Sequence, residues 1–211
     1  MEKKIAIIGT RGAGVSFVAD YLAHLLSRAG QNINLVDASE SKSIYKKYSL
    51  VKQQEAQESI ELTDSLTIGI KKTVDQELEH IELVDYGTGE ISLKEYEAFT
   101  TVLFVTDLDF SKFQNLMEMH SGRLKRIETV RLIVNKDIRG KVTQSSVIAG
   151  FEELFSSTHY IDFDERSLDY DLYSRITGTM CFRKLGRSTQ KQLYQIANEL
   201  IGITVPLRKL R

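Results

Sequence analysis

The stretch "IIGTRGAGVSFVADYLAHLL", Ile7–Leu26, decides the fold, because it joins an apolar run, a glycine-rich turn and an amphipathic segment in that order. The run at 4–9 has the length of a strand. Between 16 and 29 the apolar residues recur at helical spacing, and the pattern stops at Gly30, which favours a helix followed by a glycine. A strand that passes through glycines directly into a helix is typical of a phosphate-binding loop.

The turn can be compared with the pattern GxxxxGK[ST], in which backbone N–H groups surround the phosphates, the lysine reaches the outer phosphates and the hydroxyl holds magnesium. The segment Gly9–Ser16 matches every fixed position except the lysine, where it has Val15. The main-chain donors and the helix N-terminus still favour an anion without that charge. We therefore expect a nucleotide to bind the loop and the first helical residues, namely Gly9, Thr10, Arg11, Gly12, Ala13, Gly14, Val15, Ser16 and Phe17.

Apolar runs rich in Ile and Val alternate with helical patterns along the rest of the chain. Several runs are apolar at consecutive residues, which is typical of strands covered on both faces of a parallel sheet. The expected strands lie at 4–9, 33–38, 66–70, 80–87, 101–107, 130–136 and 159–164, and a last helix is expected at 189–202. Residues 40–80 are polar and give no clear pattern beyond partial helix. The sequence predicts an α/β fold, P-loop NTPase-like, with a doubly wound, mainly parallel sheet of about seven strands and helices on both faces.

Composition limits the classes of protein to which the chain can belong. Its 211 residues, of which 42% are hydrophobic, predict a single domain over 1–211, ending in a basic tail at 203–211. A formal net charge of -1 argues against general nucleic-acid binding. The lone Cys181 offers neither an internal disulfide nor a cysteine pair for zinc. Because no run of about 18 apolar residues occurs, we expect no transmembrane segment. We expect the protein to be cytoplasmic.

Polar residues at the ends of three expected strands mark the edge where open α/β sheets bind ligands. These residues are Asp37, Asp85 and Asn135, and we expect all three near the nucleotide. For each aspartate, capping of the turn or helix that follows its strand is the alternative role. The guanine-binding motif Asn-Lys-x-Asp is matched only in part, because Asp137 comes one residue early.

Together with these strands, the loop resembles that of the deviant Walker A ATPases of the MinD/ParA type, a group that includes TadZ/CpaE-like pilus-assembly proteins. The resemblance covers nearly the whole chain and includes "INLVDAS", "HIELVDYGTG" and "VRLIVNK". It implies ATP or ADP as the ligand, with Ser16 and Asp85 on the Mg²⁺ side and Asn135 at the adenine. The family's second carboxylate, after the strand that ends near Asp37, is replaced by Ser39.

The loop is a degenerate version of the family's loop, because Thr10 and Val15 stand where relatives carry two lysines. Phosphoryl transfer depends on stabilising charge on the phosphoryl oxygens, and losing one such contact commonly costs roughly 100-fold in rate. The replacements predict a pseudo-ATPase that binds nucleotide weakly or does not hydrolyse it, without catalytic residues. TadZ-like relatives imply a localisation or scaffold factor for a secretion, pilus or conjugation apparatus.

That resemblance also implies partners: a homodimer, and a protein of a membrane-associated assembly that would place the chain at the membrane periphery. The basic segment "VPLRKLR" at 205–211 fits either a solvated end or a membrane-docking segment as in MinD relatives, which Pro206 would interrupt as a helix.

Other interpretations stay open. Arg11 would make the protein a slow ATPase in positioning or partitioning if its guanidinium replaced the lost lysines, whereas a plain exposed loop arginine fits equally well. An NAD(P)-dependent Rossmann oxidoreductase is a second alternative, since Gly12 and Gly14 follow a strand and Asp37 stands where a ribose-binding acid belongs. Phe17, at the place of the third glycine, weighs against it. The loop is a structural remnant if no nucleotide binds.

Overall fold

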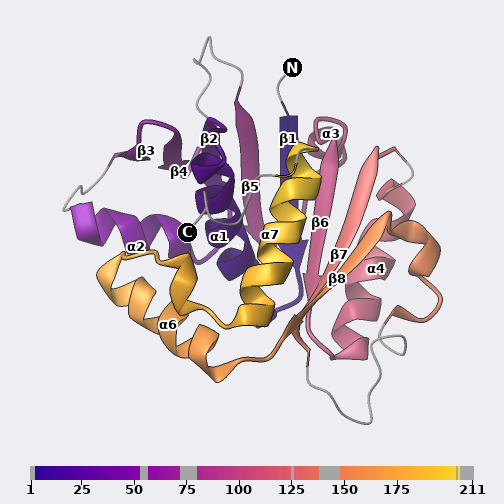
Figure 1. Ribbon diagram of the computed structural model, residues 1–211. Coiled ribbons are helices and arrows are strands. Elements are labelled where there is room, and N and C mark those ends of the chain that lie inside the picture. The colour runs from indigo at the N-terminus through magenta and orange to yellow at the C-terminus, as the bar shows by residue number, and fades with distance from the viewer. Residues whose placement is uncertain are drawn as a thin grey trace.

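A computed structural model describes residues 3–52, 57–71, 80–124, 126–137, 148–202 and 204. In this part of the chain a single sheet holds eight strands in the order β3-β4-β2-β5-β1-β6-β7-β8 (Figure 1). The strands are β1 Lys3–Gly9, β2 Ile33–Asp37, β3 Ser59–Thr63, β4 Leu66–Gly69, β5 Ile81–Gly87, β6 Thr101–Thr106, β7 Thr129–Asp137 and β8 Ser157–Asp162. Neighbouring strands are parallel except β3 and β4, which are antiparallel.

The predicted doubly wound α/β fold is confirmed, with one strand more than expected. The additional strand, β3, comes from the polar stretch that the sequence did not resolve, where the burial pattern of Ser59–Thr63 leaves only Ile60 fully buried. It forms an edge hairpin with β4. An edge strand buries few side chains, so its sequence carries little of the apolar signal that marks the central strands.

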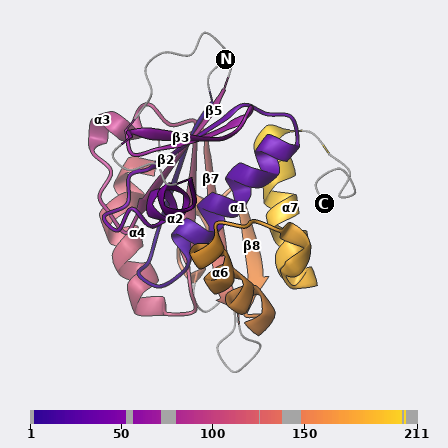
Figure 2. The same ribbon diagram turned by 90° about the vertical axis from the view of Figure 1, so that its left-hand side faces the viewer.

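Helices cover both faces of the sheet, as predicted (Figure 2). They are α1 Val15–Arg28, α2 Ser43–Lys52, α3 Leu93–Tyr96, α4 Phe110–Leu124, α6 Glu165–Thr177 and α7 Arg187–Ile201, with short 3₁₀ turns η1 Glu152–Leu154 and η2 Phe182–Lys184. One apolar cluster joins α1, α2 and α7 to one face, and a second joins α3 and α4 to the other. Each strand near the centre is therefore buried on both sides.

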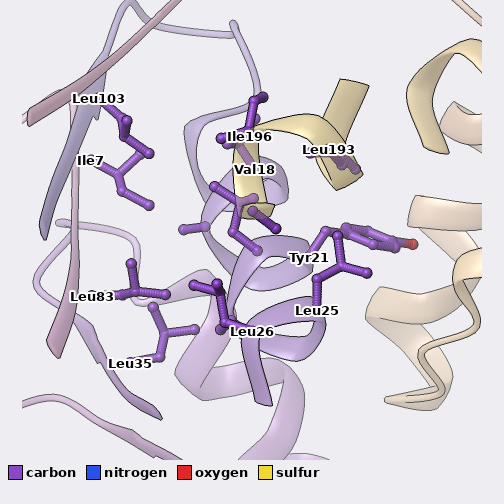
Figure 3. Close-up of a cluster of buried hydrophobic side chains, with 14 of the residues drawn as sticks. Ile7, Val18, Tyr21, Leu25, Leu26, Leu35, Leu83, Leu103, Leu193 and Ile196 are labelled. Carbon is purple, nitrogen blue, oxygen red and sulfur yellow. The ribbon is translucent and has the colours of Figure 1, made fainter. Parts of the chain in front are cut away.

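The helix that follows the glycine loop is the centre of the larger cluster (Figure 3). Val18 and Leu26 of α1 are fully buried between the apolar side chains of the central strands and those of α7. A buried aliphatic side chain contributes about 1.5–3 kcal/mol to folding, so this packing fixes the start of α1 relative to β1. The loop between them is consequently held at both ends by the core.

The chain reverses its direction of winding around β1, which lies between β5 and β6. It runs from β1 to β2 on one side and later from β5 to β6 on the other, so a crevice opens at the carboxyl ends of these parallel strands. The predicted tail at 203–211 lies outside the described residues apart from residue 204. None of the described helices is long and apolar enough to cross a membrane.

Candidate nucleotide-binding site

The loop from Gly9 to Gly14 follows β1 so closely that two of its glycines are required by geometry. A Cβ on Gly9 would stand 2.0 Å from the carbonyl oxygen of Val105, because β1 and β6 touch at this point. Gly14 is the N-cap of α1 in the left-handed conformation, with φ 84°, and no side chain caps the helix. The first turn of α1 therefore presents backbone N–H groups that lack intrahelical acceptors, which is the arrangement that binds phosphate.

Val15, at the position of the missing lysine, is part of the core. Its side chain is 5% exposed and belongs to the apolar cluster beneath α1. Its Cγ2 atom lies 2.8 Å from where a Cβ on Gly9 would stand, so valine and glycine fit each other across the loop. The loop thus keeps its backbone donors but carries an apolar side chain where the pattern requires a cation.

A cavity of about 580 Å³ opens in front of the loop, within the size range of small-molecule sites. It is lined by the loop and the start of α1, the segment after β2, residues 87–88, the end of β7, and the segment from β8 into α6. Of the predicted nucleotide-binding residues, those that line it are Thr10, Arg11, Gly12, Gly14, Val15, Ser16, Phe17 and Asn135. The others, Gly9, Ala13, Asp37 and Asp85, are buried and do not line it.

Asp85 is a fully buried carboxylate at the end of β5. Its Oδ1 accepts a hydrogen bond of 2.8 Å from the backbone N–H of Gly87, whereas its Oδ2 has no hydrogen-bond partner among the described residues. Burial raises the pKa of Asp85 to about 6; the nearby Ser16 side chain lowers it, and the Asp37 carboxylate raises it further. An orphaned buried oxygen is costly, and such perturbed groups cluster at functional sites.

The Ser16 hydroxyl and the Asp85 carboxylate are oxygen donors of the kind Mg²⁺ prefers. Two protein oxygens suit an ion that keeps most of its coordination for water and phosphate. In the described residues, no group of three or more acidic, His or Cys side chains could hold a metal ion by itself. The orphaned Oδ2 of Asp85 fits a phosphate-bound Mg²⁺ better than a protein-only metal site.

Asp37 is also fully buried, but its carboxylate is occupied by protein donors. Oδ2 accepts from the backbone N–H groups of Ile44 and Tyr45, at 2.9 and 3.0 Å, and Oδ1 accepts from the backbone and hydroxyl of Ser39, at 3.2 and 2.5 Å. Asp37 therefore anchors the first turn of α2, which is the capping role that the sequence left as its alternative.

Two further loop residues differ in their surroundings. Thr10, in place of the family's first lysine, is 5% exposed, and its hydroxyl lies 3.3 Å from that of Thr106. Arg11 is exposed at the cavity and has no hydrogen-bond or ion-pair partner among the described residues. Thr10 thus packs beneath the loop against β6, whereas the Arg11 guanidinium is available to an anion.

The end of β7 contacts the loop directly. The side-chain amide of Asn135 donates to the carbonyl of Ala13 at 2.6 Å, and the ammonium of Lys136 donates to the carbonyl of Gly12 at 2.6 Å. Sequence reasoning placed Asn135 at the site but missed Lys136, although it follows Asn135 directly at a predicted strand end. It also missed the acidic and basic pair of α6 at the cavity, Asp171 and Arg175, whose side chains lie 2.8 Å apart.

Comparison with known proteins supports this fold. No known family profile matches the sequence, and neither does any curated protein. Among solved structures, a Borrelia burgdorferi protein with a proposed role in plasmid partition, bound to AMPPNP, has a TM-score of 0.71 at 14% identity and covers 95% of this chain and 98% of its own. MinD of Pyrococcus horikoshii with Mg-ADP has a TM-score of 0.68 at 14% identity, over 95% and 96% of the two chains.

A third structure is a chain of the MinC:MinD cell division complex of Aquifex aeolicus, with a TM-score of 0.67 at 13% identity over 97% of each chain. At such low identity these likenesses show the fold alone. The chain therefore has the fold of MinD- and ParA-type P-loop ATPases along nearly its whole length.

Proposed function

We propose that this protein is a degenerate MinD/ParA-like member that binds ATP or ADP with Mg²⁺ and hydrolyses it slowly or not at all. The observation that carries the proposal is the pairing of an open phosphate-type loop with the orphaned Oδ2 of Asp85 beneath it. A loop kept only for structure would gain nothing from a buried, unpartnered carboxylate. Bound Mg²⁺ would supply the positive charge that this oxygen lacks.

The absence of turnover follows from the charges at the loop. Catalysis of phosphoryl transfer requires positive charge held close to the transferring group. Val15 is apolar and packed into the core, and Thr10 is buried against Thr106. Ser39, which stands in place of a second carboxylate, donates its hydroxyl hydrogen bond to the Asp37 side chain. The Arg11 side chain is exposed at the loop and has no partner among the described residues, so it defines the slow-ATPase alternative.

In place of catalysis, the proposed role is localisation or scaffolding, in line with the partition and division proteins that share the fold. The resemblance to TadZ-type proteins extends this to a secretion, pilus or conjugation apparatus, with a membrane-associated protein partner and a peripheral position at the membrane. Such a role requires an interaction surface whose state depends on the nucleotide.

Helix α6 offers such a surface because its polarity is inverted. Its inward side carries the buried residues Ser167, Asp171 and Ser174. Its outward side, the α6 apolar face, is formed by exposed side chains, namely Leu168, Leu172, Tyr173 and Ile176, which are 44%, 51%, 53% and 82% exposed. Contiguous exposed apolar side chains of this kind mark interaction sites.

A second copy of this chain is the proposed occupant of the α6 apolar face. The helix has three acidic residues, one of them the inward Asp171 paired with Arg175, and two basic residues, so its charges are close to balanced and the face does not strongly repel its own copy across a two-fold axis. The balance also argues against an anionic membrane as the occupant, since that requires a basic excess. Leu168 lines the nucleotide cavity as well, so nucleotide and partner would meet at one helix.

Nucleotide binding can be tested with a pair of glycine variants. Gly14→Ala would place a Cβ 2.6 Å from the Asn135 amide at φ +84°, whereas Gly30→Ala meets nothing within 4 Å at φ +86°. Both pay the backbone cost of roughly 1–2 kcal/mol. We expect fluorescent ADP with Mg²⁺ to bind wild type and Gly30→Ala alike and Gly14→Ala at least roughly tenfold more weakly. Equal binding by all three would place the nucleotide elsewhere.

Dimerisation is tested by sedimentation with and without ATP and Mg²⁺. We expect a nucleotide-dependent dimer that Leu172→Asp abolishes. Leu93→Asp, at a 62% exposed leucine on α3 beyond the opposite face of the sheet, is the matched control and should leave it intact. A dimer that survives Leu172→Asp, or a monomer under all conditions, would show that the α6 apolar face is not a dimer interface. Sustained phosphate release lost in Arg11→Ala would establish the slow ATPase instead.

A further inference from the structure

The end of β7 holds the glycine loop through two side chains on consecutive residues. Asn135 and Lys136 donate to the carbonyls of Ala13 and Gly12, each at 2.6 Å, across 122 and 124 residues of sequence. Both hydrogen bonds engage peptide groups just before α1 begins. The loop is therefore held against the sheet by side chains of β7, which lie far from the loop in the sequence.

The backbone conformation of Lys136 favours its hydrogen bond to Gly12. Its φ is +60°, one of two positive values among the described residues other than glycine. A left-handed conformation costs a residue with a side chain roughly 1–2 kcal/mol. The Lys136 N–H is held at 3.0 Å by the Oδ1 of Asn135, the same side chain whose amide binds the loop. The strained turn thus directs the lysine stem toward Gly12.

Holding these carbonyls also orients the donors of the site. A trans peptide is planar, so its C=O and the following N–H point in opposite directions. With the carbonyls of Gly12 and Ala13 turned to β7, the N–H groups of Ala13 and Gly14 point away from β7. The Ala13 N–H is used by the carbonyl of Thr10, at 3.1 Å, which leaves that of Gly14 for an anion.

Charge adds to this geometry. A hydrogen bond from an ammonium group contributes about 1.5–3 kcal/mol, more than one between neutral groups. Val15 brings no charge to the loop, and Lys136 lines the same cavity. The Lys136 ammonium is therefore a fixed cation at the loop, bound to the carbonyl of the peptide that precedes the one whose N–H is left for the ligand.

We propose that Lys136 is a positioning residue that holds the 12–14 segment in its anion-binding conformation, in compensation for the lysine lost at Val15. It acts by fixing the backbone of the loop rather than by contacting the phosphates of the ligand. Its effect on ligand affinity rests on the proposed nucleotide binding, whereas its effect on the loop does not. The two can be measured separately.

The test compares Lys136→Met, which keeps the stem and loses the ammonium, with Lys136→Arg, which keeps a cation. Lys42→Met is the matched control: Lys42 also has a positive φ, of 51°, and its ammonium donates to a backbone carbonyl, that of Asp37, at 2.7 Å. Circular dichroism and thermal melting confirm that all variants fold. Each variant is then measured with and without nucleotide.

The first readout is hydrogen exchange of the Thr10 and Ala13 amides in protein free of nucleotide, because these N–H groups donate to the carbonyls of Val105 in β6 and of Thr10 in the loop, at 2.9 and 3.1 Å. We expect exchange roughly tenfold faster in Lys136→Met, following the loss of one charged hydrogen bond, and wild-type rates in Lys42→Met. Lys136→Arg should recover most of the protection. Unchanged exchange in Lys136→Met would overturn the proposal.

The second readout is the dissociation rate of fluorescent ADP with Mg²⁺. We expect Lys136→Met to release it roughly tenfold faster, with Lys42→Met unchanged and Lys136→Arg between the two. Faster exchange without faster release would show a structural tether only, and would overturn the positioning role. If wild type binds no nucleotide, the proposed function fails, while the exchange data still decide whether Lys136 holds the loop.

Discussion

Asp37 and Asp85 are register partners on the adjacent parallel strands β2 and β5, and both are fully buried, yet their carboxylates have opposite surroundings. Asp37 accepts four hydrogen bonds from Ser39, Ile44 and Tyr45, whereas Asp85 accepts the Gly87 N–H on Oδ1, has the Ser16 side chain nearby, and leaves Oδ2 without a partner among the described residues. One carboxylate therefore holds the fold together, and the other has an oxygen that the proposed function assigns to a ligand.

The first prediction concerns stability and pH. The pKa of Asp85 is raised by burial to about 6, above its ordinary 3.8, so its protonated form favours the folded state. This contribution is fully present below pH 3.8 and is lost as the pH rises through 6, a difference of about 3 kcal/mol. We expect Asp85→Asn to be up to about 3 kcal/mol more stable than wild type at pH 8, with the advantage vanishing near pH 4.

Urea unfolding of both proteins between pH 4 and 8 measures this difference. The register partner supplies the contrast, because Asp37→Asn replaces an acceptor of four hydrogen bonds and should lower stability by about 2 kcal/mol or more at pH 7. A pH-independent gap between wild type and Asp85→Asn, or a loss of stability in Asp85→Asn at pH 7, would show that Asp85 has a structural partner.

The two carboxylates also show how far the sequence could be read. Their positions at strand ends followed from the apolar runs, and so did the parallel sheet and the glycine-rich loop between β1 and α1, because these depend on local patterns. Their different roles could not be predicted. Whether an aspartate is satisfied depends on where the next segment returns, and α2 lies in the polar stretch whose pattern was weak.

The second prediction restores the missing charge. Val15→Lys should lower stability by about 1–3 kcal/mol, because the Val15 side chain is 5% exposed and packs against the apolar cluster. A cation there should raise the affinity for ADP by roughly tenfold. Phosphate release should stay at background, because Thr10 and Ser39 still replace the other catalytic groups. Calorimetry and a phosphate-release assay measure both quantities.

Val15→Met, of similar length without charge, is the control for the packing change. It should lose stability without gaining affinity. Rapid turnover by Val15→Lys would mean that the lack of a single cation prevents catalysis. The replacements at Thr10 and Ser39 would then not explain the absence of turnover.

The third prediction concerns the buried contact that holds α2 and α6 to α1. The ammonium of Lys47 donates to Asp20 Oδ2 at 2.8 Å and to Ser174 Oγ at 3.2 Å, and its side chain is 4% exposed. Lys47→Met would leave Asp20 buried without its cation, which typically costs 3–5 kcal/mol. Urea unfolding should show a loss of about 3 kcal/mol or more.

Lys46→Met, at the exposed neighbouring residue of α2, is the matched control and should change stability by less than about 0.5 kcal/mol. Equal stability of the two variants would show that Asp20 is satisfied without Lys47.

Contacts between distant segments set the limit of sequence reasoning. Lys136 reaches Gly12 across a separation of 124 residues, and no spacing in the sequence indicates that contact. In α6, the spacing of Leu168, Leu172 and Ile176 alone would indicate a core-facing stripe. The structure turns this stripe outward, because the opposite side of α6 meets the polar contact around Lys47.

The central claim, nucleotide binding without turnover, is tested most directly by one calorimetric titration of the protein with ATP in the presence of Mg²⁺. Binding alone gives injection heats that saturate and return to baseline, and this is the result we expect. A sustained heat flow after each injection, proportional to the amount of protein, would reveal hydrolysis. An absence of binding heat at millimolar ATP, with the same result for ADP, would show that the loop is a remnant.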